Sequence, residues 1–442
     1  MADVSGFRGI RYAFDRFDSP PEELLAPPYD VIDEDEQAEL YERHPNNVIR
    51  LVLNRIRDGD DAENNRYTRA RRLLMDWLAD GTLRLDDERA LYAHEQAFEE
   101  GGETYRRLGF LGLVRLSPYE DRIVLPHEET HRGPKEDRLK LMKACECNLS
   151  PIFLLYDDPE REIESRLRAA IDDRPADLDV ETEHDGIRHR LWPVFDGQTQ
   201  CKIAGELADD QLLIADGHHR YETALTYREF RRKHAEHPDR DAPWNYVLAF
   251  LVNMHSPGLK IFPTHRIVHS LPDFDPDGLV DSLQASESFD VGRLDGSTVD
   301  DPDAVVDDLE SSGTTPAFAL LGDAFDAPLR VEFTGGLDAP VFDEETRREV
   351  RRLDTAVLRD AIVDDLLGIG EDAREEKRYI RYTRDGDEAL DAVDDEETQM
   401  VVMMKSPSIE NVVDVCRAGG KMPQKSTYFY PKILSGLAFN PL

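Results

Sequence analysis

The sequence predicts an α/β fold of mixed α+β character with more than one domain. The chain has 442 residues, more than the roughly 100–200 residues of a typical domain. Short apolar runs of strand length alternate with longer segments of helical periodicity. Neither an internal repeat nor a low-complexity linker interrupts this alternation. A chain of this length can bury a core that needs no disulfide or structural metal.

Apolar spacing and turn residues predict the elements of the first 270 residues. Residues 66–79 have the spacing of a helix, and strands over 91–98 and 108–116 flank a Gly-Gly turn as a hairpin. We further expect strands over 152–156, 212–215 and 247–253, helices over 136–145, 160–173 and 220–234, and an acidic connector over 174–185.

The rest of the chain divides into an acidic lobe and a basic tail. Residues 271–400 are rich in Asp and Gly, whereas residues 419–442 contain three lysines and no acid. Here we expect strands over 317–321, 329–333 and 400–404 and helices over 344–366 and 412–418. The predicted domains are an N-terminal α/β lobe (1–158), a core (159–270), an acidic α/β lobe (271–400) and a basic segment that packs back on the core (401–442).

The charge balance indicates the salt conditions in which the protein works and says little about its binding partner. The net charge is −39, and 11 lysines stand beside 43 arginines. Abundant acids with scarce lysine are typical of proteins from salt-in halophiles, where molar salt screens the repulsion between carboxylates. The bulk charge also disfavours a nucleic-acid partner.

Several classes of protein are excluded or disfavoured. The longest apolar run has about seven residues, far short of the roughly 20 of a membrane span, so no membrane partner is expected. The N-terminus lacks a secretory signal, and we expect a cytoplasmic protein. Four cysteines without a second pair at zinc spacing make a zinc site improbable, and no haem is expected. The oligomeric state is left open.

Retained lysines point to an anionic ligand. Six of the eleven lysines fall in two short windows, 135–143 and 421–432. One interpretation is that they pair with neighbouring acids. The other is that point charges in these windows bind an anion such as phosphate.

The strongest local motif is the stretch from Leu213 to Ala224. A strand runs into Asp216-Gly217, and a helix begins at His218-His219-Arg220. Such a turn exposes backbone N–H groups at a helix N-terminus, and Arg220 adds further donors, which together suit phosphate. The alternative is a plain turn with histidines as caps. A metal held by both histidines is disfavoured because neighbouring side chains diverge.

A second cluster lies between His127 and Arg138. His127 and Glu128 are acid/base candidates, while Thr130 and Lys135 suit phosphate. The alternative is a solvated loop. Residues 127–131 also match the H-E-x-x-H zinc pattern. That pattern requires a helix, and the flanking prolines and Gly133 leave room for only a short one.

Two further clusters hold candidate anion or supporting residues. The first is Thr264-His265-Arg266, and the second is the stretch 422–432, which includes Lys425 and Ser426. A Lys-Ser-Thr run with aromatics suits an anion-binding strand, and its alternative is a strand that packs its aromatics inside.

The order of these motifs resembles one family. Residues 26–32, 44–47, 127–138, 148–153, 216–220, 263–266 and 422–432 follow one another as in domain-of-unknown-function family 1015. The resemblance covers nearly the whole chain and implies no function by itself.

A local resemblance does imply a function. The unit strand–Asp-Gly-His-His-Arg–helix is similar to the nucleotide-phosphate turn of the ParB/sulfiredoxin superfamily, which includes archaeal kinases of free serine. It implies a ParB/sulfiredoxin-like nucleotide-binding core elaborated by additional α/β lobes. It also implies that Gly217, His218, His219 and Arg220 hold phosphates, with Asp216 near a metal or the substrate hydroxyl.

We therefore expect a kinase that moves phosphate from ATP or ADP to a small hydroxyl substrate, free serine first. Mg²⁺ would be held by Asp216 and Glu128, and Glu128 or His127 would accept the hydroxyl proton. The expected residues divide into catalytic (His127, Glu128, Asp216), phosphate-binding (Lys135, Gly217, His218, His219, Arg220, Lys425, Ser426) and substrate-binding or supporting (Arg138, Asn148, Thr264, His265, Arg266).

Neither a P-loop nor protein-kinase motifs occur in the sequence. Two alternatives remain open. One is a nucleotide-binding regulator of ParB type without turnover, and the other is a metal-dependent hydrolase that would use His127, Glu128 and His131.

Overall fold

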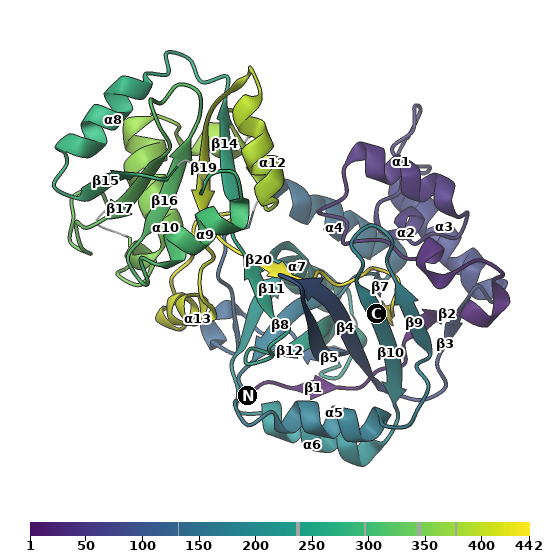
Figure 1. The fold of residues 1–442 in the computed structure, drawn as a ribbon. Helices are drawn as coiled ribbons and strands as arrows, with labels where there is room; N and C mark the ends of the chain where they lie inside the picture. The colour runs from purple at the N-terminus through teal and green to yellow at the C-terminus, as the bar shows by residue number, and fades with distance from the viewer. Residues whose placement is uncertain (131, 236–238, 296–297, 343–345, 376–377) are drawn as a thin grey trace. The chain divides into compact units, whose positions relative to one another are not determined.

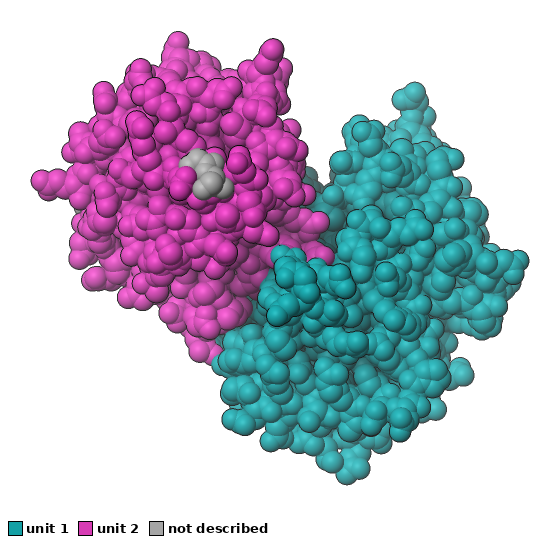
Figure 2. Space-filling view, in the orientation of Figure 1, with its two compact units in different colours: residues 1–126, 130–260, 431–442 teal, residues 127–129, 261–430 magenta. Residues whose placement is uncertain are grey.

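The computed structural model divides into two compact units. Unit 1 comprises Met1–Pro126, Thr130–Lys260 and Pro431–Leu442, and unit 2 comprises His127–Glu129 and Ile261–Tyr430 (Figures 1 and 2). The structure describes all residues except 131, 236–238, 296–297, 343–345 and 376–377. The predicted mixed α/β class is confirmed. The structure has two compact units, and the expected division of the chain into four domains stays a prediction.

Unit 1 is built on a nine-stranded mixed sheet. Its strands are β1 (Val4–Ser5), β4 (Leu91–Glu100), β5 (Glu103–Arg115), β6 (Val124–Leu125), β8 (Ile152–Tyr156), β9 (Leu178–Glu181), β10 (Arg188–Val194), β11 (Leu212–Asp216) and β12 (Tyr246–Asn253). The order is β6-β11-β8-β12-β5-β4-β10-β9, and β1 pairs with β5. Two pairs, β6–β11 and β8–β12, are parallel, and the other pairs are antiparallel.

Helices of unit 1 cover this sheet and form a second core. The main core joins the sheet to α5 (Glu162–Ile171), α6 (Gly197–Leu207) and α7 (His218–His234). A second core packs α1 (Glu34–Arg43), α2 (Ile49–Val52), α3 (Arg66–Ala79) and α4 (Arg132–Cys145) around the antiparallel pair of β2 (Ile10–Tyr12) and β3 (Leu83–Leu85). The chain returns as β21 (Asn440–Pro441), which pairs with β7 (Cys147–Asn148).

Unit 2 is a six-stranded sheet with helices on both faces. The order is β15 (Phe289–Arg293), β17 (Leu329–Phe333), β16 (Ala317–Leu321), β19 (Thr398–Met404), β14 (His265–His269) and β18 (Ile380–Thr383). One face packs on α8 (Pro276–Ala285) and the π-helix Leu358–Leu366, and the other on α9 (Pro302–Glu310) and α12 (Gly386–Asp391). Helix α10 (Asp354–Val357), α11 (Glu371–Glu375), α13 (Ile409–Ala418), β13 (Lys260–Phe262) and β20 (Tyr428–Tyr430) complete it.

Two sequence predictions are wrong in part. The acidic connector over 174–185 contains β9, because Leu178 and Val180 alternate with exposed acids and face the core. The helix expected over 344–366 is broken at Leu353, whose φ of −84° and ψ of 133° are those of extended backbone. Its residues 344 and 345 lie outside the described residues. No helix of the described chain is long and apolar enough to cross a membrane.

Candidate functional site

The turn between β11 and α7 places a carboxylate, a glycine and a helix N-terminus in direct succession. Asp216 ends β11, Gly217 is the N-cap, and α7 begins at His218. Gly217 has φ 93° and ψ 29°, and no side chain caps the helix there. The first N–H groups of a helix have no intrahelical partner, so this turn offers donors and a positive dipole end to an anion.

Two cations converge on the Asp216 carboxylate. Arg220 Nη2 donates to Oδ2 at 2.8 Å, and Lys432 Nζ lies 3.6 Å from Oδ1. Burial alone would raise the pKa of Asp216, but Lys432, Arg220 and His218 outweigh it and hold the pKa far below its usual range. The carboxylate is therefore ionised at neutral pH, and a group with such a low pKa is a poor proton acceptor.

Arg220 has donor capacity beyond this ion pair. Its side chain is 8% exposed, and it also donates to the Pro151 carbonyl. Within the described part of the chain, its Nε has no hydrogen-bond partner. A buried guanidinium N–H without a partner costs free energy, which a ligand or an ordered water at this position would recover.

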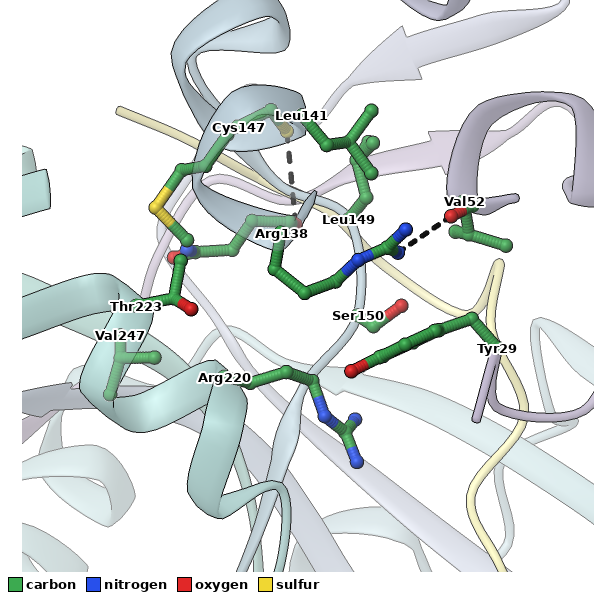
Figure 3. A pocket seen from close by; sticks show the side chains of 12 residues that line it. Tyr29, Val52, Arg138, Leu141, Cys147, Leu149, Ser150, Arg220, Thr223 and Val247 are labelled. Carbon is green, nitrogen blue, oxygen red and sulfur yellow. Dashed lines mark hydrogen bonds between the residues drawn. The ribbon is translucent and has the colours of Figure 1, made fainter. Parts of the chain in front are cut away.

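A small pocket lies beside Arg220 in unit 1 (Figure 3). Its volume is about 40 Å³, enough for a few water molecules. Figure 3 shows the Tyr29 ring between the side chains of Arg138 and Arg220. Thr223, one turn after Arg220 on α7, also lines the pocket, and its buried Oγ1 has no partner among the described residues.

Arg138 and Asn148, expected as supporting residues, line this same pocket. The Arg138 guanidinium lies 4.0 Å from the centroid of the Tyr29 ring, and Nη1 donates to the Val52 carbonyl at 2.7 Å. Burial lowers the pKa of Arg138 to about 10. Asn148 Oδ1 accepts from Leu248 N at 3.2 Å, which ties the pocket wall to β12. Both side chains therefore shape the pocket through backbone contacts.

Lys135 pairs with an acid, as the first interpretation of the lysines proposed. Its Nζ donates to Glu222 Oε2 at 2.9 Å and to Thr130 Oγ1 at 3.0 Å. Thr130 Oγ1 donates to the same Glu222 oxygen at 2.7 Å. A role of Lys135 in phosphate binding would require it to leave this cluster and stays a prediction.

His127 and Glu128 belong to unit 2. His127 is fully buried, its Nε2 lies 2.9 Å from Thr427 Oγ1, and its carbonyl accepts from Met422 N at 2.7 Å. The Glu128 side chain is 25% exposed, and its Oε1 lies 3.9 Å from His127 Nε2. His127 thus meets residues 422–427 of the last cluster within this unit. The two catalytic roles stay predictions.

Among the described residues 127–130, the H-E-x-x-H pattern lacks the helix that zinc-protease geometry requires. Residues 126–130 are irregular, and α4 begins only at Arg132. His131 lies outside the described residues. The described residues also include no group of three or more His, Cys, Asp or Glu side chains that could hold a metal ion.

Lys425 and Ser426 also lie in unit 2, with different environments. Lys425 is exposed and has φ 57°, an uncommon value for a residue with a side chain. Ser426 is 1% exposed, and its Oγ donates to Pro423 O at 2.5 Å and lies 2.9 Å from Thr355 Oγ1. Its hydroxyl is committed within the unit, whereas the Lys425 side chain reaches solvent.

Residues 264–266 make contacts that fix β14. His265 Nδ1 accepts from Met404 N at 3.1 Å, and burial, with a smaller contribution from Arg266, lowers its pKa to about 4. Arg266 donates to the Thr264 carbonyl and to Lys425 O at 3.3 Å. These are supporting contacts, and substrate binding by these residues stays a prediction.

Sequence reasoning missed several residues around Asp216. Lys432 was visible as a retained lysine but was not assigned to the site. Thr223 and Glu222 follow Arg220 on α7, and helical spacing from Arg220 could have identified Thr223. Tyr29 belongs to residues 26–32, one of the stretches that carry the family resemblance, but only the tertiary fold brings it to Arg220.

Gly217→Ala is expected to lower the free energy of unfolding by about 1–2 kcal/mol, since a left-handed conformation costs this much for a residue with Cβ. The new Cβ would also lie 3.0 Å from Arg220 Nε and 3.1 Å from Ile152 Cγ2. Denaturant unfolding of the variant and the wild type measures this change in the free energy of unfolding. Gly205→Ala in α6 is the control, because open space surrounds that position. An unchanged free energy at Gly217 would contradict the conformation described here.

The fold and this turn define a mixed α/β protein with a candidate anion site at a strand–glycine–helix junction. Residues 4–399 match the family model described as "Protein of unknown function (DUF1015)", and the chain belongs to this family. A search of curated proteins gives no match.

The solved structures that match this chain include one described as "Free serine kinase in complex with AMP". That likeness has 15% identity and a TM-score of 0.34 and covers 70% of this chain and 83% of that chain. A conserved hypothetical protein from Pyrococcus furiosus has 15% identity and a TM-score of 0.33, and the match covers 70% of this chain and 89% of that chain. SbnI with C-terminal truncation from Staphylococcus aureus has 10% identity and a TM-score of 0.33, and the match covers 74% of this chain and 85% of that chain. At such identities and TM-scores, the likeness assigns no substrate and no residue role.

Proposed function

We propose that the protein is a nucleotide-dependent phosphotransferase that moves phosphate to a small alcohol, with free serine as the first substrate to test. The observation that carries this proposal is the convergence of Arg220 and Lys432 on the turn at the N-terminus of α7. In a chain with a net charge of −39, two cations beside the N-terminus of a helix would form a site for an anion.

Phosphoryl transfer depends on positioning and on charge stabilisation, and unit 1 supplies groups for both. The N–H groups at His218 and His219 would bind phosphate oxygens, and Arg220 would add charge-assisted hydrogen bonds. Lys432 Nζ lies 3.6 Å from Asp216 Oδ1, and a phosphate bound at this turn would compete with Asp216 for the lysine's charge.

The expected Mg²⁺ site does not fit Asp216 as it stands. Both carboxylate oxygens of Asp216 face cations, Arg220 on one side and Lys432 on the other. A divalent cation placed there would meet two positive charges before any nucleotide brought its own phosphates. Binding of Mg²⁺ by Asp216 and Glu128 stays a prediction.

One observation favours a second candidate, a nucleotide-binding regulator. The carboxylate at the turn, Asp216, has too low a pKa to serve as a base, and both expected bases, Glu128 and His127, belong to the other unit. If neither base serves the anion site, the protein would bind a nucleotide without turning it over.

A direct assay separates the two candidates. Purified protein in molar KCl with Mg²⁺ is incubated with ATP or ADP and a panel of hydroxyl acceptors, serine first, and phosphorylated product is measured. Product supports the phosphotransferase. Tight nucleotide binding without any product supports the regulator. Absence of nucleotide binding overturns both, because both depend on the turn at Gly217.

Glu128→Gln is expected to lower kcat by about 10²–10⁴-fold and to leave nucleotide affinity nearly unchanged, because a general base acts on the chemical step. Glu129→Gln is the matched control. The Glu129 side chain is next in sequence, is 65% exposed, and its Oε1 lies 3.7 Å from Lys421 Nζ. Equal kcat values for the two variants would remove Glu128 from the mechanism. Initial rates and ADP titration provide both readouts.

A further inference from the structure

Two side chains on neighbouring strands hold the returning chain beside the candidate site. Gln96 on β4 and Arg107 on β5 stand directly opposite each other in the strand register, and both are 0% exposed. Arg107 Nε donates to Gln96 Oε1 at 3.1 Å, so each fixes the orientation of the other. The Arg107 guanidinium also lies 4.9 Å from the centroid of the Phe153 ring.

This pair contacts the backbone of two consecutive residues of the tail. Arg107 Nη2 donates to the carbonyl of Pro431, and Gln96 Nε2 donates to that of Lys432 at 2.8 Å. The same Lys432 carries the Nζ that lies 3.6 Å from Asp216 Oδ1. The backbone at Lys432 is thereby fixed to the sheet, while the side chain reaches the turn.

We propose that Gln96 and Arg107 are positioning residues that hold Lys432 at Asp216, so that its ammonium can serve the anion site. Burying a guanidinium and an amide in a sheet is costly unless their hydrogen bonds are satisfied, and here backbone carbonyls of the tail satisfy them. Pro431 has no N–H, so its carbonyl is the backbone group by which this residue can be held. The inference rests on the proposed nucleotide site for its ligand, although the geometry stands without it.

A double-mutant cycle tests this with ADP as the probe. Lys432→Ala is expected to lower ADP affinity about tenfold, the order of a hydrogen bond to a charged group. Gln96→Met and Arg107→Lys are each expected to lower it by a similar factor. In the Lys432→Ala background, either change should have no further effect on affinity, because positioning residues act through Lys432. Additive losses would overturn the inference.

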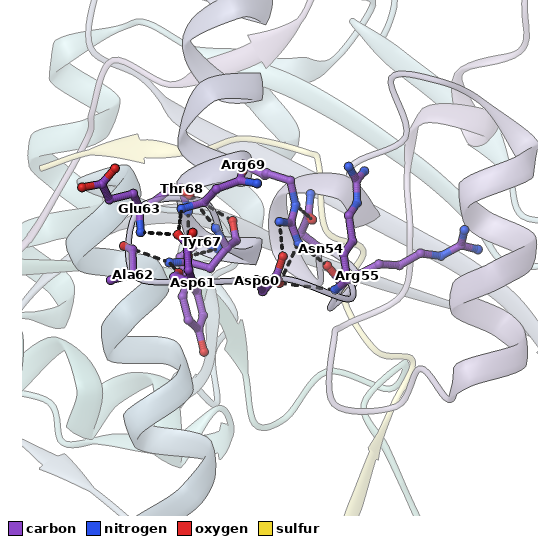
Figure 4. A network of polar contacts seen from close by, with 12 residues as sticks. Asn54, Arg55, Asp60, Asp61, Ala62, Glu63, Tyr67, Thr68 and Arg69 are labelled. Carbon is purple, nitrogen blue, oxygen red and sulfur yellow. Dashed lines mark hydrogen bonds and ion pairs between the residues drawn. The ribbon is translucent and has the colours of Figure 1, made fainter.

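Arg69→Lys is the matched control for a buried arginine outside this arrangement. Arg69 of α3 is 6% exposed and donates to the Arg55 carbonyl at 2.7 Å and to Asp60, in the network shown in Figure 4. Arg69→Lys should lower Tm without changing ADP affinity. Gln96→Met keeps the test available where Arg107→Lys does not fold.

A second readout needs no nucleotide. The Lys432 side chain is 17% exposed, and its reaction with an amine-selective reagent, followed by mass spectrometry, reports its confinement. Gln96→Met should raise this rate at least severalfold, together with hydrogen exchange in residues 432–436, whereas Arg69→Lys should change neither. Unchanged labelling and exchange would overturn the positioning role. A wild-type protein that binds no ADP but shows the labelling result would instead refute the proposed function alone.

Discussion

Arg220→Ala is expected to lower the rate of phosphoryl transfer by about 10²–10³-fold, the usual cost of removing one preorganised donor from developing charge. The substitution removes the hydrogen bond to Asp216 at 2.8 Å and the Nε donor that has no partner in the described protein. It also leaves the Pro151 carbonyl without this donor, so a loss of stability is expected as well. Rates are therefore measured under conditions where far-UV circular dichroism shows that the variant is folded.

Arg220→Lys separates charge from geometry. An ammonium keeps the charge beside Asp216, but it cannot donate to Asp216 and Pro151 in the fork geometry of a guanidinium. We expect partial recovery of ADP affinity and little recovery of kcat. Full activity of the lysine variant would show that a point charge suffices and that the bidentate arrangement is incidental.

Loss of folded structure in dilute buffer is the second large effect expected. With a net charge of −39 and a screening length of roughly 30 Å at 0.01 M salt, carboxylates over the whole surface repel one another. Among the described acids, only Glu95, Glu164 and Asp354 are buried, so nearly all of this repulsion passes through solvent that salt can screen. Circular dichroism should show unfolding on dialysis and recovery in molar KCl.

Equal ionic strengths of KCl and NaCl should restore the structure alike if screening is the cause. A signal that is the same in dilute buffer and in molar salt would refute the interpretation of the composition as halophilic. A strong preference for one cation would point to specific binding in place of screening.

Local patterns predicted many elements of the fold. Helix 66–79 and strand 152–156 have the expected bounds because a complete apolar face or run marks them. The strand within 174–185 was missed because its two buried residues stand among acids that suggested a loop. At the break, Leu353 has extended backbone and Asp354 Oδ1 accepts from Ala317 N at 2.8 Å, a tertiary contact that local periodicity does not report.

The candidate site was predictable where one short stretch contains it. Asp216, Gly217 and Arg220 are neighbours in sequence, so the chemistry of the turn could be inferred from residue types alone. Lys432 lies far along the chain, and its contact with Asp216 depends on the register of β4 and β5, which places Gln96 opposite Arg107. The two-residue Gly-Gly turn fixes that register, but no spacing in the sequence shows that the tail returns to this strand pair.

The order of segments in unit 1 has a consequence for biosynthesis. Residues 431–442 complete this unit, with Phe439 fully buried and paired with Ile10, yet the ribosome makes them only after residues 261–430. At roughly 5–20 residues per second, the nascent first part of unit 1 waits on the order of ten to thirty seconds for Lys432. A polypeptide released early would lack this lysine, so premature termination cannot yield the complete candidate site described here.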